Sequence, residues 1–263
     1  MALLKPLNRP LREWRGQRVW IVGASTGIGA ALAQQLAHQG ALVALSARSV
    51  ERLSAAATAC GEGAVIEPMD VTRAEDYARV RDSLVTRWGA IDLVVFNAGT
   101  YGAERAWELS DAGIRATLET NLIGVMNGVG SVAPMLCERG AGAIAIVGSV
   151  AGYGGLPRSA VYGPSKAALI NFAESLYLDL KPRGISVFLI SPGFVATPLT
   201  ARNKFRMPAL ISAEEAAAAI MAGLARGSFE IHFPKRFTCV LRALRWLPRR
   251  TYFALIRRLT GAQ

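Results

Sequence analysis

Three side chains within one short stretch have the types and spacing for acid–base chemistry: Ser149, Tyr162 and Lys166. Tyr162 and Lys166 are four residues apart, at the start of a segment with apolar residues at helical spacing, so they share one helix face. A phenol has a pKa of about 10, and a neighbouring ammonium favours its phenolate. At about 4 Å and an effective dielectric near 20, this attraction lowers that pKa by up to roughly 3 units before desolvation is subtracted. The spacing therefore predicts that Tyr162 exchanges protons near neutral pH. A solvated surface pair is the alternative.

Buried elements must position these three residues. Residues 142–148 are small or β-branched, which predicts a buried strand that delivers Ser149 at its end. A glycine-rich loop follows, and within the range 158–180 Tyr162 then opens the helical segment that carries the Tyr–Lys pair. Pro164 lies between the two residues, in the first turn of that helix, where its missing N–H is tolerated.

A second glycine-rich turn lies near the start of the chain. The nearly all-apolar run 18–25 predicts a buried strand, and an amphipathic helix ended by Gly40 follows it. Between them lie Gly23, Gly27 and Gly29, spaced G-x-x-x-G-x-G. A strand, a glycine-rich turn and a helix together present backbone N–H groups to a phosphate. On its own this arrangement only suggests a nucleotide site, because other glycine-rich turns share it.

The next strand, 41–47, ends in Arg48 and Ser49. In a nucleotide-binding βαβ unit this point meets the adenosine ribose, where an acidic residue would bind the 2′-hydroxyl. Here no acid is present, and a guanidinium pairs well with phosphate oxygens. We therefore expect NADP(H) to be favoured over NAD(H). An exposed loop arginine is the alternative, and the glycine-rich turn itself carries no basic residue.

The remaining elements repeat this alternation of strand and helix. Further strands are expected at 64–71, 91–96, 184–191 and 229–233, and helices at 73–88, 111–138 and 212–226. Small or polar residues follow several of these strands, which lets the backbone approach a ligand closely. They are Asp70 and Val71, then Asn97, Ala98 and Gly99, and then Pro192 and Gly193.

Two further features concern the same region. Asn121 lies in an apolar part of the expected helix 111–138, and in isolation it reads as a satisfied core amide rather than a catalytic group. Residues 198–211 are mixed in character and suit a mobile lid over a pocket. They follow Val195 and Thr197.

Composition limits the class of protein. The chain has 263 residues, 52% hydrophobic and 19% charged, which indicates a compact globular protein. No apolar run is long enough to span a membrane, and none near residue 1 resembles a signal peptide. Three cysteines lie far apart without metal-ligand spacing, which predicts reduced thiols in the cytoplasm. The two histidines are too few for a histidine-based metal site, so no metal is expected.

The formal charge of +11 is concentrated at the two ends. Residues 19–229 carry equal numbers of basic and acidic side chains, whereas residues 230–263 carry eight Lys or Arg and one Glu. After residue 235 the sequence predicts two short amphipathic helices rich in arginine, separated by Pro248. Such helices suit an anionic membrane surface, at the inner face of a membrane. The alternatives are that they cover the protein's own pocket or a partner subunit. Nucleic acid is not expected, because the segments are too apolar.

Together these motifs resemble the short-chain dehydrogenases/reductases over about residues 17–235. The elements occur in the order of that family. They are Gly23-Ala-Ser-Thr-Gly27-Ile-Gly29, Asn97-Ala98-Gly99, Asn121, Ser149 with Tyr162-x-x-x-Lys166, and Pro192-Gly193 followed by Thr197. The gap of 13 residues between Ser149 and Tyr162 is also that of the family.

The resemblance implies a role for each matched residue. Tyr162 is the acid and base, Lys166 lowers its pKa and holds the nicotinamide ribose, and Ser149 binds the substrate oxygen. Asn121 bends its helix and anchors a water that relays protons to Lys166. The remaining matched residues bind the cofactor. Gly23, Ser25, Gly27, Ile28 and Gly29 line the pyrophosphate, and Arg48 with Ser49 meets the 2′-phosphate. Asp70 and Val71 meet the adenine ring, Asn97 the adenosine side and Thr197 the carboxamide. The other expected cofactor-binding residues are Thr26, Ala98, Gly99, Pro192, Gly193 and Val195.

The expected fold is α/β, a Rossmann-type doubly wound sheet of about seven mostly parallel strands with helices on both faces, in three layers. We expect a basic arm over 1–16, one catalytic domain over 17–235 and a basic amphipathic extension over 236–263. The implied activity is NADPH-dependent reduction of an apolar or lipid-like ketone, or the reverse oxidation of a secondary alcohol, by a homodimer or homotetramer. An NADP(H)-binding sensor with little turnover is the alternative.

Overall fold

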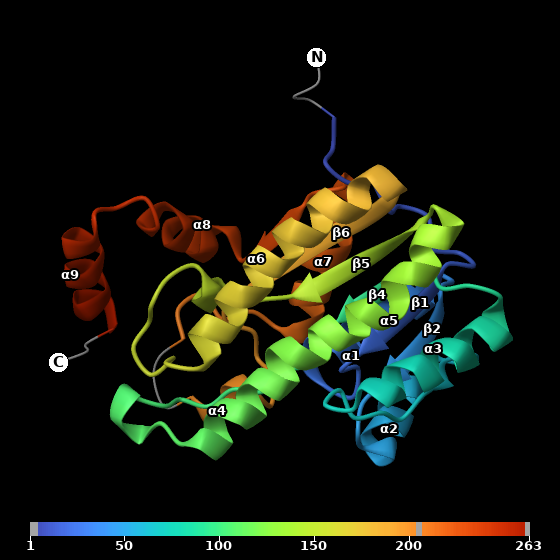
Figure 1. The fold of residues 1–263 in the computed structure, drawn as a ribbon, viewed down its shortest axis with the longest axis horizontal. Coiled ribbons are helices and arrows are strands. Elements are labelled where there is room, and N and C mark those ends of the chain that lie inside the picture. Colours follow the sequence, from blue (N-terminus) through green and yellow to red (C-terminus); the bar gives the residue numbers. More distant parts are fainter. Residues whose placement is uncertain (1–4, 204–206, 261–263) are drawn as a thin grey trace.

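The computed structural model describes residues 5–203 and 207–260 of the chain. Its centre is a seven-stranded sheet in the order β3-β2-β1-β4-β5-β6-β7, and every neighbouring pair is parallel (Figure 1). The strands are β1 (Arg18–Val22), β2 (Leu42–Ser46), β3 (Val65–Ile66), β4 (Leu93–Phe96), β5 (Gly142–Val147), β6 (Ile185–Pro192) and β7 (Glu230–Phe233). The predicted fold class is confirmed.

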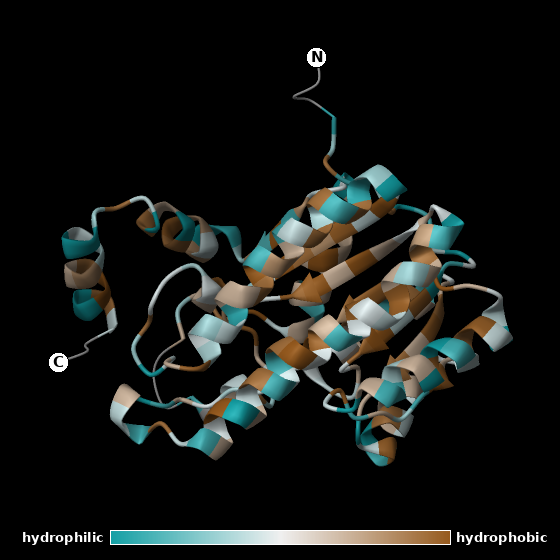
Figure 2. Ribbon diagram, viewed as in Figure 1, coloured by the Kyte–Doolittle hydropathy of each residue, from teal (hydrophilic) through white to brown (hydrophobic). Residues whose placement is uncertain are grey.

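Helices cover both faces of this sheet. One face carries α1 (Gly27–His38), α2 (Val50–Cys60) and α7 (Ala213–Arg226), and the other carries α3 (Ala74–Trp88), α5 (Gly124–Arg139) and α6 (Tyr162–Leu180). Strand β1 is nearly all apolar because its side chains are buried on both faces of the sheet. Val19 and Ile21 pack into the core on the first face, while Trp20 and Val22 pack into the core on the second. Figure 2 shows the hydrophobic residues gathered along the strands between the helices.

The structure departs from the sequence-based expectation in several elements. Strand β3 has two residues rather than 64–71, because it lies at the sheet edge and Pro68 has no N–H to donate. On either side of it, Glu67 N still donates to Leu45 O of β2, and Met69 N donates to Ala47 O just after β2. The helix in the range 158–180 begins at Tyr162, so Pro164 lies in its first turn. Helix α2 was not predicted, although Ser49 caps it by accepting a hydrogen bond from Arg52 N.

The helix expected over 111–138 is interrupted at its centre. It comprises α4 (Asp111–Leu118), a π-helical turn over Glu119–Ile123, and α5. A π turn inserts one extra residue into the helical ladder, which often occurs at functional sites. Asn121 lies in this turn.

Both ends of the chain are docked on the body. The side chain of Asn8 donates to Val187 O (2.6 Å) and accepts from Val187 N (3.0 Å), which holds the amino-terminal arm against β6. At the other end, α8 (Lys235–Leu244) and α9 (Arg249–Thr260) follow β7 and lie beyond the end of the sheet at which β5 points (Figure 1). Residues 1–4 of the arm, 204–206 of the expected lid and 261–263 of the extension lie outside the described residues. No helix in the described part is both long and apolar enough to cross a membrane.

Alanine substitutions at two glycines of α5 would test how closely this helix packs on the sheet and on α3. A Cβ on Gly128 would lie 2.6 Å from the Tyr77 ring and closer still to Phe96, whereas nothing lies within 4 Å of a Cβ on Gly130. We expect Gly128→Ala to lower the free energy of unfolding by about 1–3 kcal/mol through overpacking. Gly130→Ala should raise it by about 0.5–1 kcal/mol, because alanine restricts the unfolded chain. Urea unfolding of both variants measures the difference, and equal effects would contradict this account of the packing.

Candidate active site

The functional residues gather at the carboxyl ends of the parallel strands. A cavity of about 330 Å³ lies there, lined by segments that follow β1, β2, β4, β5 and β6. This volume is in the range of small-molecule sites. Ligands of open α/β sheets bind at this edge, because all parallel strands deliver their following loops to it.

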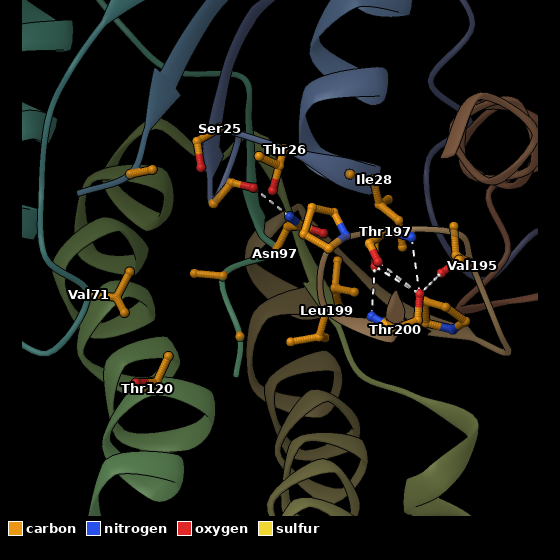
Figure 3. Close-up of a pocket in the computed structure, with 18 of the residues that line it drawn as sticks. Ser25, Thr26, Ile28, Val71, Asn97, Thr120, Val195, Thr197, Leu199 and Thr200 are labelled. Atoms are coloured by element: carbon orange, nitrogen blue, oxygen red, sulfur yellow. Dashed lines mark hydrogen bonds between the residues drawn. The ribbon is translucent and has the colours of Figure 1, made fainter. Parts of the chain in front are cut away.

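The glycine-rich turn after β1 is held by close backbone contacts. Asn97, at the end of β4, donates from Nδ2 to Gly23 O (2.6 Å; Figure 3). A Cβ on Gly23 would lie 2.6 Å from Ala98 Cα, and a Cβ on Gly29 would lie 2.6 Å from Asn97 Nδ2. Gly23 also has φ of 89°, which disfavours other residues. These glycines are therefore required for the turn to approach β4.

The amino end of α1 is suited to an anion. Its N-cap, Thr26, makes no side-chain capping hydrogen bond, and the first turn contains no acidic residue. The first N–H groups of a helix lack partners within the helix, and their partial positive charge attracts phosphate. Thr26, Gly27 and Ile28 line the cavity at this point (Figure 3). This open helix end, together with the close turn, fits the pyrophosphate of a dinucleotide.

Ser149, Tyr162 and Lys166 converge at the other end of the cavity. Ser149 follows β5, and its Oγ accepts a hydrogen bond from Ala151 N (3.1 Å). Tyr162 is the first residue of α6, and its hydroxyl is hydrogen-bonded to Ser149. The Lys166 ammonium lies 5.7 Å from the centre of the Tyr162 ring and donates to Val147 O (2.9 Å). The three polar groups predicted from spacing are thus adjacent.

The pKa values differ from the expectation based on charge alone. Burial raises the pKa of Tyr162, and the hydrogen bond with Ser149 offsets this only in part. Lys166 is 4% exposed, and burial lowers the pKa of its ammonium to about 8. The expected lowering of the Tyr162 pKa is therefore not found here. The ammonium faces the ring and the Val147 carbonyl, and burial is the largest influence on the phenol.

Asn121 lies behind the cavity wall rather than in it. Its amide is fully buried: Oδ1 accepts from Thr100 N (2.7 Å), and Nδ2 donates to Thr100 O (2.9 Å) and Ser165 Oγ (3.2 Å). These bonds leave one acceptor position free. A Cβ on Gly99 would lie 3.4 Å from Asn121 Oδ1 and 3.7 Å from Lys166 Nζ, so only this glycine separates the amide from the ammonium. Asn121 is a satisfied core amide that also borders the site.

At the far end of the cavity, after β2, lie Arg48, Ser49 and Arg52. Asp70 lies across from them. Burial raises the pKa of Asp70, but hydrogen bonds from Thr72 and the charges of Arg48 and Arg73 together hold it below its usual value. Arg52 was not predicted, because it belongs to α2. Its position three residues after the capping Ser49 is the pattern that could have indicated it.

A hydroxyl cluster shapes the segment after β6. Thr200 Oγ1 lies 3.3 Å from Thr197 Oγ1 and donates to the Val195 carbonyl (Figure 3). A Cβ on Gly27 would lie 2.9 Å from Thr197 Cγ2, so this segment closes over the glycine-rich turn. Pro198, Leu199 and Thr200, from the expected lid, line the cavity here.

Tyr101 covers the reactive phenol. Its ring contacts that of Tyr162 edge-on, with ring centres 5.0 Å apart and planes at 85°. This arrangement is favourable for two aromatic rings and limits the directions from which a substrate reaches the hydroxyl. The sequence gives no periodic pattern that marks Tyr101, because it lies in the loop after Gly99.

The loop after Ser149 is secured from the outside by a polar network. Tyr153 and Ser191 both donate to the Glu230 carboxylate, which also pairs with Arg242 of α8 (3.5 Å). Arg242 donates to His232 Nε2 (2.9 Å). The extension therefore contacts groups within four residues of Ser149.

All but two of the predicted site residues line one cavity. The exceptions are Asn121 and Gly29, which support its wall. Sequence reasoning missed Tyr101, which packs on Tyr162, and the lining residue Arg52. It also missed several lining residues that have no distinctive type: Ala47, Met69, Thr120, Val147 and Gly148.

Comparisons with known proteins agree with this geometry. A family model described as short chain dehydrogenase matches residues 17–207. An uncharacterized oxidoreductase of Myxococcus xanthus is 37% identical over 91% of this chain and 96% of its own. An 11-beta-hydroxysteroid dehydrogenase A of Sesamum indicum is 35% identical over 72% of this chain and 55% of its own. A crystal structure of a short chain dehydrogenase/reductase from Burkholderia phymatum in complex with NAD has the same fold, with a TM-score of 0.82 at 24% identity over 88% of this chain and 94% of that one.

The bond from Asn97 to Gly23 predicts how the turn supports dinucleotide binding. Asn97→Asp keeps the size of the side chain but places a carboxylate oxygen against the Gly23 carbonyl. We expect NADPH and NADH affinity to fall together by about 5- to 100-fold, the cost of a lost buried hydrogen bond. Fluorescence titration of each cofactor measures this, with Asn171→Asp, an exposed amide on α6, as the control. Unchanged affinity in a folded variant would contradict the assignment.

Proposed function

The chain belongs to the short chain dehydrogenase family of oxidoreductases, and we propose that it catalyses the NADPH-dependent reduction of an apolar ketone to a secondary alcohol. The observation that carries the proposal is the convergence of Ser149, Tyr162 and Lys166 in the cavity that also contains the open end of α1. The site thus offers a proton donor beside a place for a dinucleotide.

The residues of the chain divide the chemistry among them. A bound nicotinamide supplies the hydride. Tyr162 donates its phenolic proton to the substrate oxygen as negative charge develops there. Ser149 donates a hydrogen bond to the same oxygen and stabilises that charge as it forms. Lys166 places a positive charge over the Tyr162 ring, which stabilises the phenolate left behind.

Two arginines support the preference for NADPH. Arg48 and Arg52 both line the far end of the cavity, where the ribose of the adenosine would lie. Guanidinium groups pair with phosphate oxygens through charge-assisted hydrogen bonds. The acidic residue typical of an NAD site at the end of β2 is replaced here by Arg48.

An apolar substrate is supported by the groups near the phenol. Tyr101 packs on Tyr162, and Leu199 and Pro198 line the cavity from the segment after β6. The steroid dehydrogenase of Sesamum indicum, which is similar in sequence, is named for an apolar ligand of this kind.

Assembly and location belong to the same proposal. We expect a homodimer or homotetramer. Exposed apolar side chains support it: Ile123 in the π-helical turn, Met126 on α5 and Leu178 on α6. We place the reaction in the cytoplasm, where the free Cys60, Cys137 and Cys239 stay reduced.

The arginine pair predicts the cofactor preference. Arg48→Gln with Arg52→Gln should raise the KM for NADPH by about 10- to 100-fold, since a hydrogen bond to a charged group contributes about 1.5–3 kcal/mol. The KM for NADH should not change, because NADH lacks the 2′-phosphate. Initial rates of cofactor oxidation measure both, and Arg87→Gln, an exposed arginine at the end of α3, is the control. A wild type that prefers NADH would refute the assignment.

The raised pKa of Tyr162 predicts opposite pH profiles for the two directions. Reduction needs the protonated phenol, so its kcat/KM should stay level through neutral pH and fall as the pH rises through that pKa. Oxidation needs the phenolate, so its kcat/KM should rise over the same range. Tyr162→Phe should lower both by about 10²- to 10⁴-fold and still bind NADPH. Cofactor binding by the wild type without turnover on a panel of ketones would instead favour a sensor.

A further inference from the structure

The two helices of the extension have an outer surface that the body does not cover. We define the α8–α9 face as the exposed apolar residues Val240, Trp246, Phe253 and Leu259 with the exposed arginines Arg236, Arg245, Arg249, Arg250, Arg257 and Arg258. We propose that this face binds the surface of an anionic lipid membrane. The proposal is independent of the proposed function.

The inner sides of both helices are already occupied. The Phe237 ring packs on Phe194, with ring centres 5.5 Å apart, and Leu244, Tyr252 and Ile256 form a buried cluster with Leu156 of the body. Tyr252 also donates a hydrogen bond to Gly155 O (2.9 Å). These contacts fix which side of each helix faces outward, so the α8–α9 face exists before any partner binds.

The outward side is apolar at its most protruding points. Trp246, in the turn between the helices, is 90% exposed, and Phe253 on α9 is 56% exposed. Tryptophan and phenylalanine partition into the interfacial region of a bilayer, where an aromatic ring lies beside the headgroups.

Arginines surround these apolar residues. Arg249, Arg250 and Arg257 lie three or four residues from Phe253, so they share its side of α9. Residues 236–263 carry seven arginines and no acidic residue. Only Arg242 forms an ion pair within the described residues, with Glu230. The other six leave an unneutralised positive surface, which attracts anionic headgroups.

The combination of charge and apolar groups favours lipid over other partners. A second copy of the chain presenting the same face would bring two arginine clusters together, which is repulsive. A nucleic acid would pair with the arginines but leave Val240 and Leu259 without apolar contact. An anionic bilayer satisfies both groups at once, because it offers negative headgroups above an apolar interior.

The inner side of α9 packs on the loop between two of the site residues. Tyr252 of α9 packs so closely on Gly154 that a Cβ there would lie 3.0 Å from its ring. Gly154, Gly155 and Leu156 belong to the loop between Ser149 and Tyr162. The helices that carry the α8–α9 face are therefore anchored to the loop between Ser149 and Tyr162.

Vesicle sedimentation of the full chain tests the proposal. The wild type should sediment with vesicles of phosphatidylglycerol and phosphatidylcholine, should not sediment with phosphatidylcholine alone, and should bind less at high salt. Arg249→Gln with Arg250→Gln should weaken the partitioning by about 30-fold, from about 1 kcal/mol for each charge near the surface. Trp246→Ser with Phe253→Ser should weaken it as well, and the four residues are exposed, so the variants should fold.

Matched controls separate this surface from general effects. Arg87→Gln with Arg183→Gln removes two exposed arginines elsewhere, and Leu42→Thr removes an exposed apolar side chain at the opposite edge of the sheet. Both should bind vesicles as the wild type does. NADPH oxidation with a water-soluble ketone should be unchanged in the α8–α9 face variants. The proposal is overturned if anionic vesicles do not bind, if all variants bind equally, or if the face instead retains an oligonucleotide or causes self-association without vesicle binding.

Discussion

The buried ammonium of Lys166 is the constraint on which the site depends. It is almost fully removed from water, and no described carboxylate pairs with it. A buried cation without a counter-charge is costly, and here the Val147 carbonyl and the Tyr162 ring are the groups that face it. The hydrogen bond joins α6 to the end of β5, the point from which Ser149 extends. The same contact that stabilises the ammonium therefore sets the distance between the three reactive side chains.

The backbone around Lys166 is correspondingly close-packed. Gly99 leaves room between the ammonium and the Asn121 amide, and the π-helical turn rotates Asn121 toward Thr100. On the other side, Asn97 draws the glycine-rich turn against β4. Parallel strands make this possible, because each delivers its next loop to one edge of the sheet. The cavity is thus a product of strand direction and of small residues at the strand ends.

Sequence reasoning succeeded where one local property decides the structure. Continuous apolar runs predicted the buried strands, and the four-residue interval placed Tyr162 beside Lys166. Sequence reasoning failed for properties that depend on how several elements pack together. The pKa of Tyr162 is raised mainly by burial, which the hydrogen bond with Ser149 offsets only in part, and burial depends on how several loops pack together. Arg52 reaches the cavity only because α2 begins at Ser49. The π turn has no sequence pattern of its own that distinguishes it from a regular helix.

Helices α8 and α9 each have one side that packs on the body and one side that is exposed, and the order of residues in the sequence determines which is which. Arginines and apolar residues alternate around each helix, so one side packs on the body while the other meets solvent. Arg242 is the exception, because it turns inward to Glu230, whose carboxylate also accepts from Tyr153 and Ser191. Its charge is thereby neutralised by Glu230, in a polar network that reaches Tyr153, four residues after Ser149. A single helix, α8, can in this way hold the catalytic loop in place and keep an uncovered basic surface beside it.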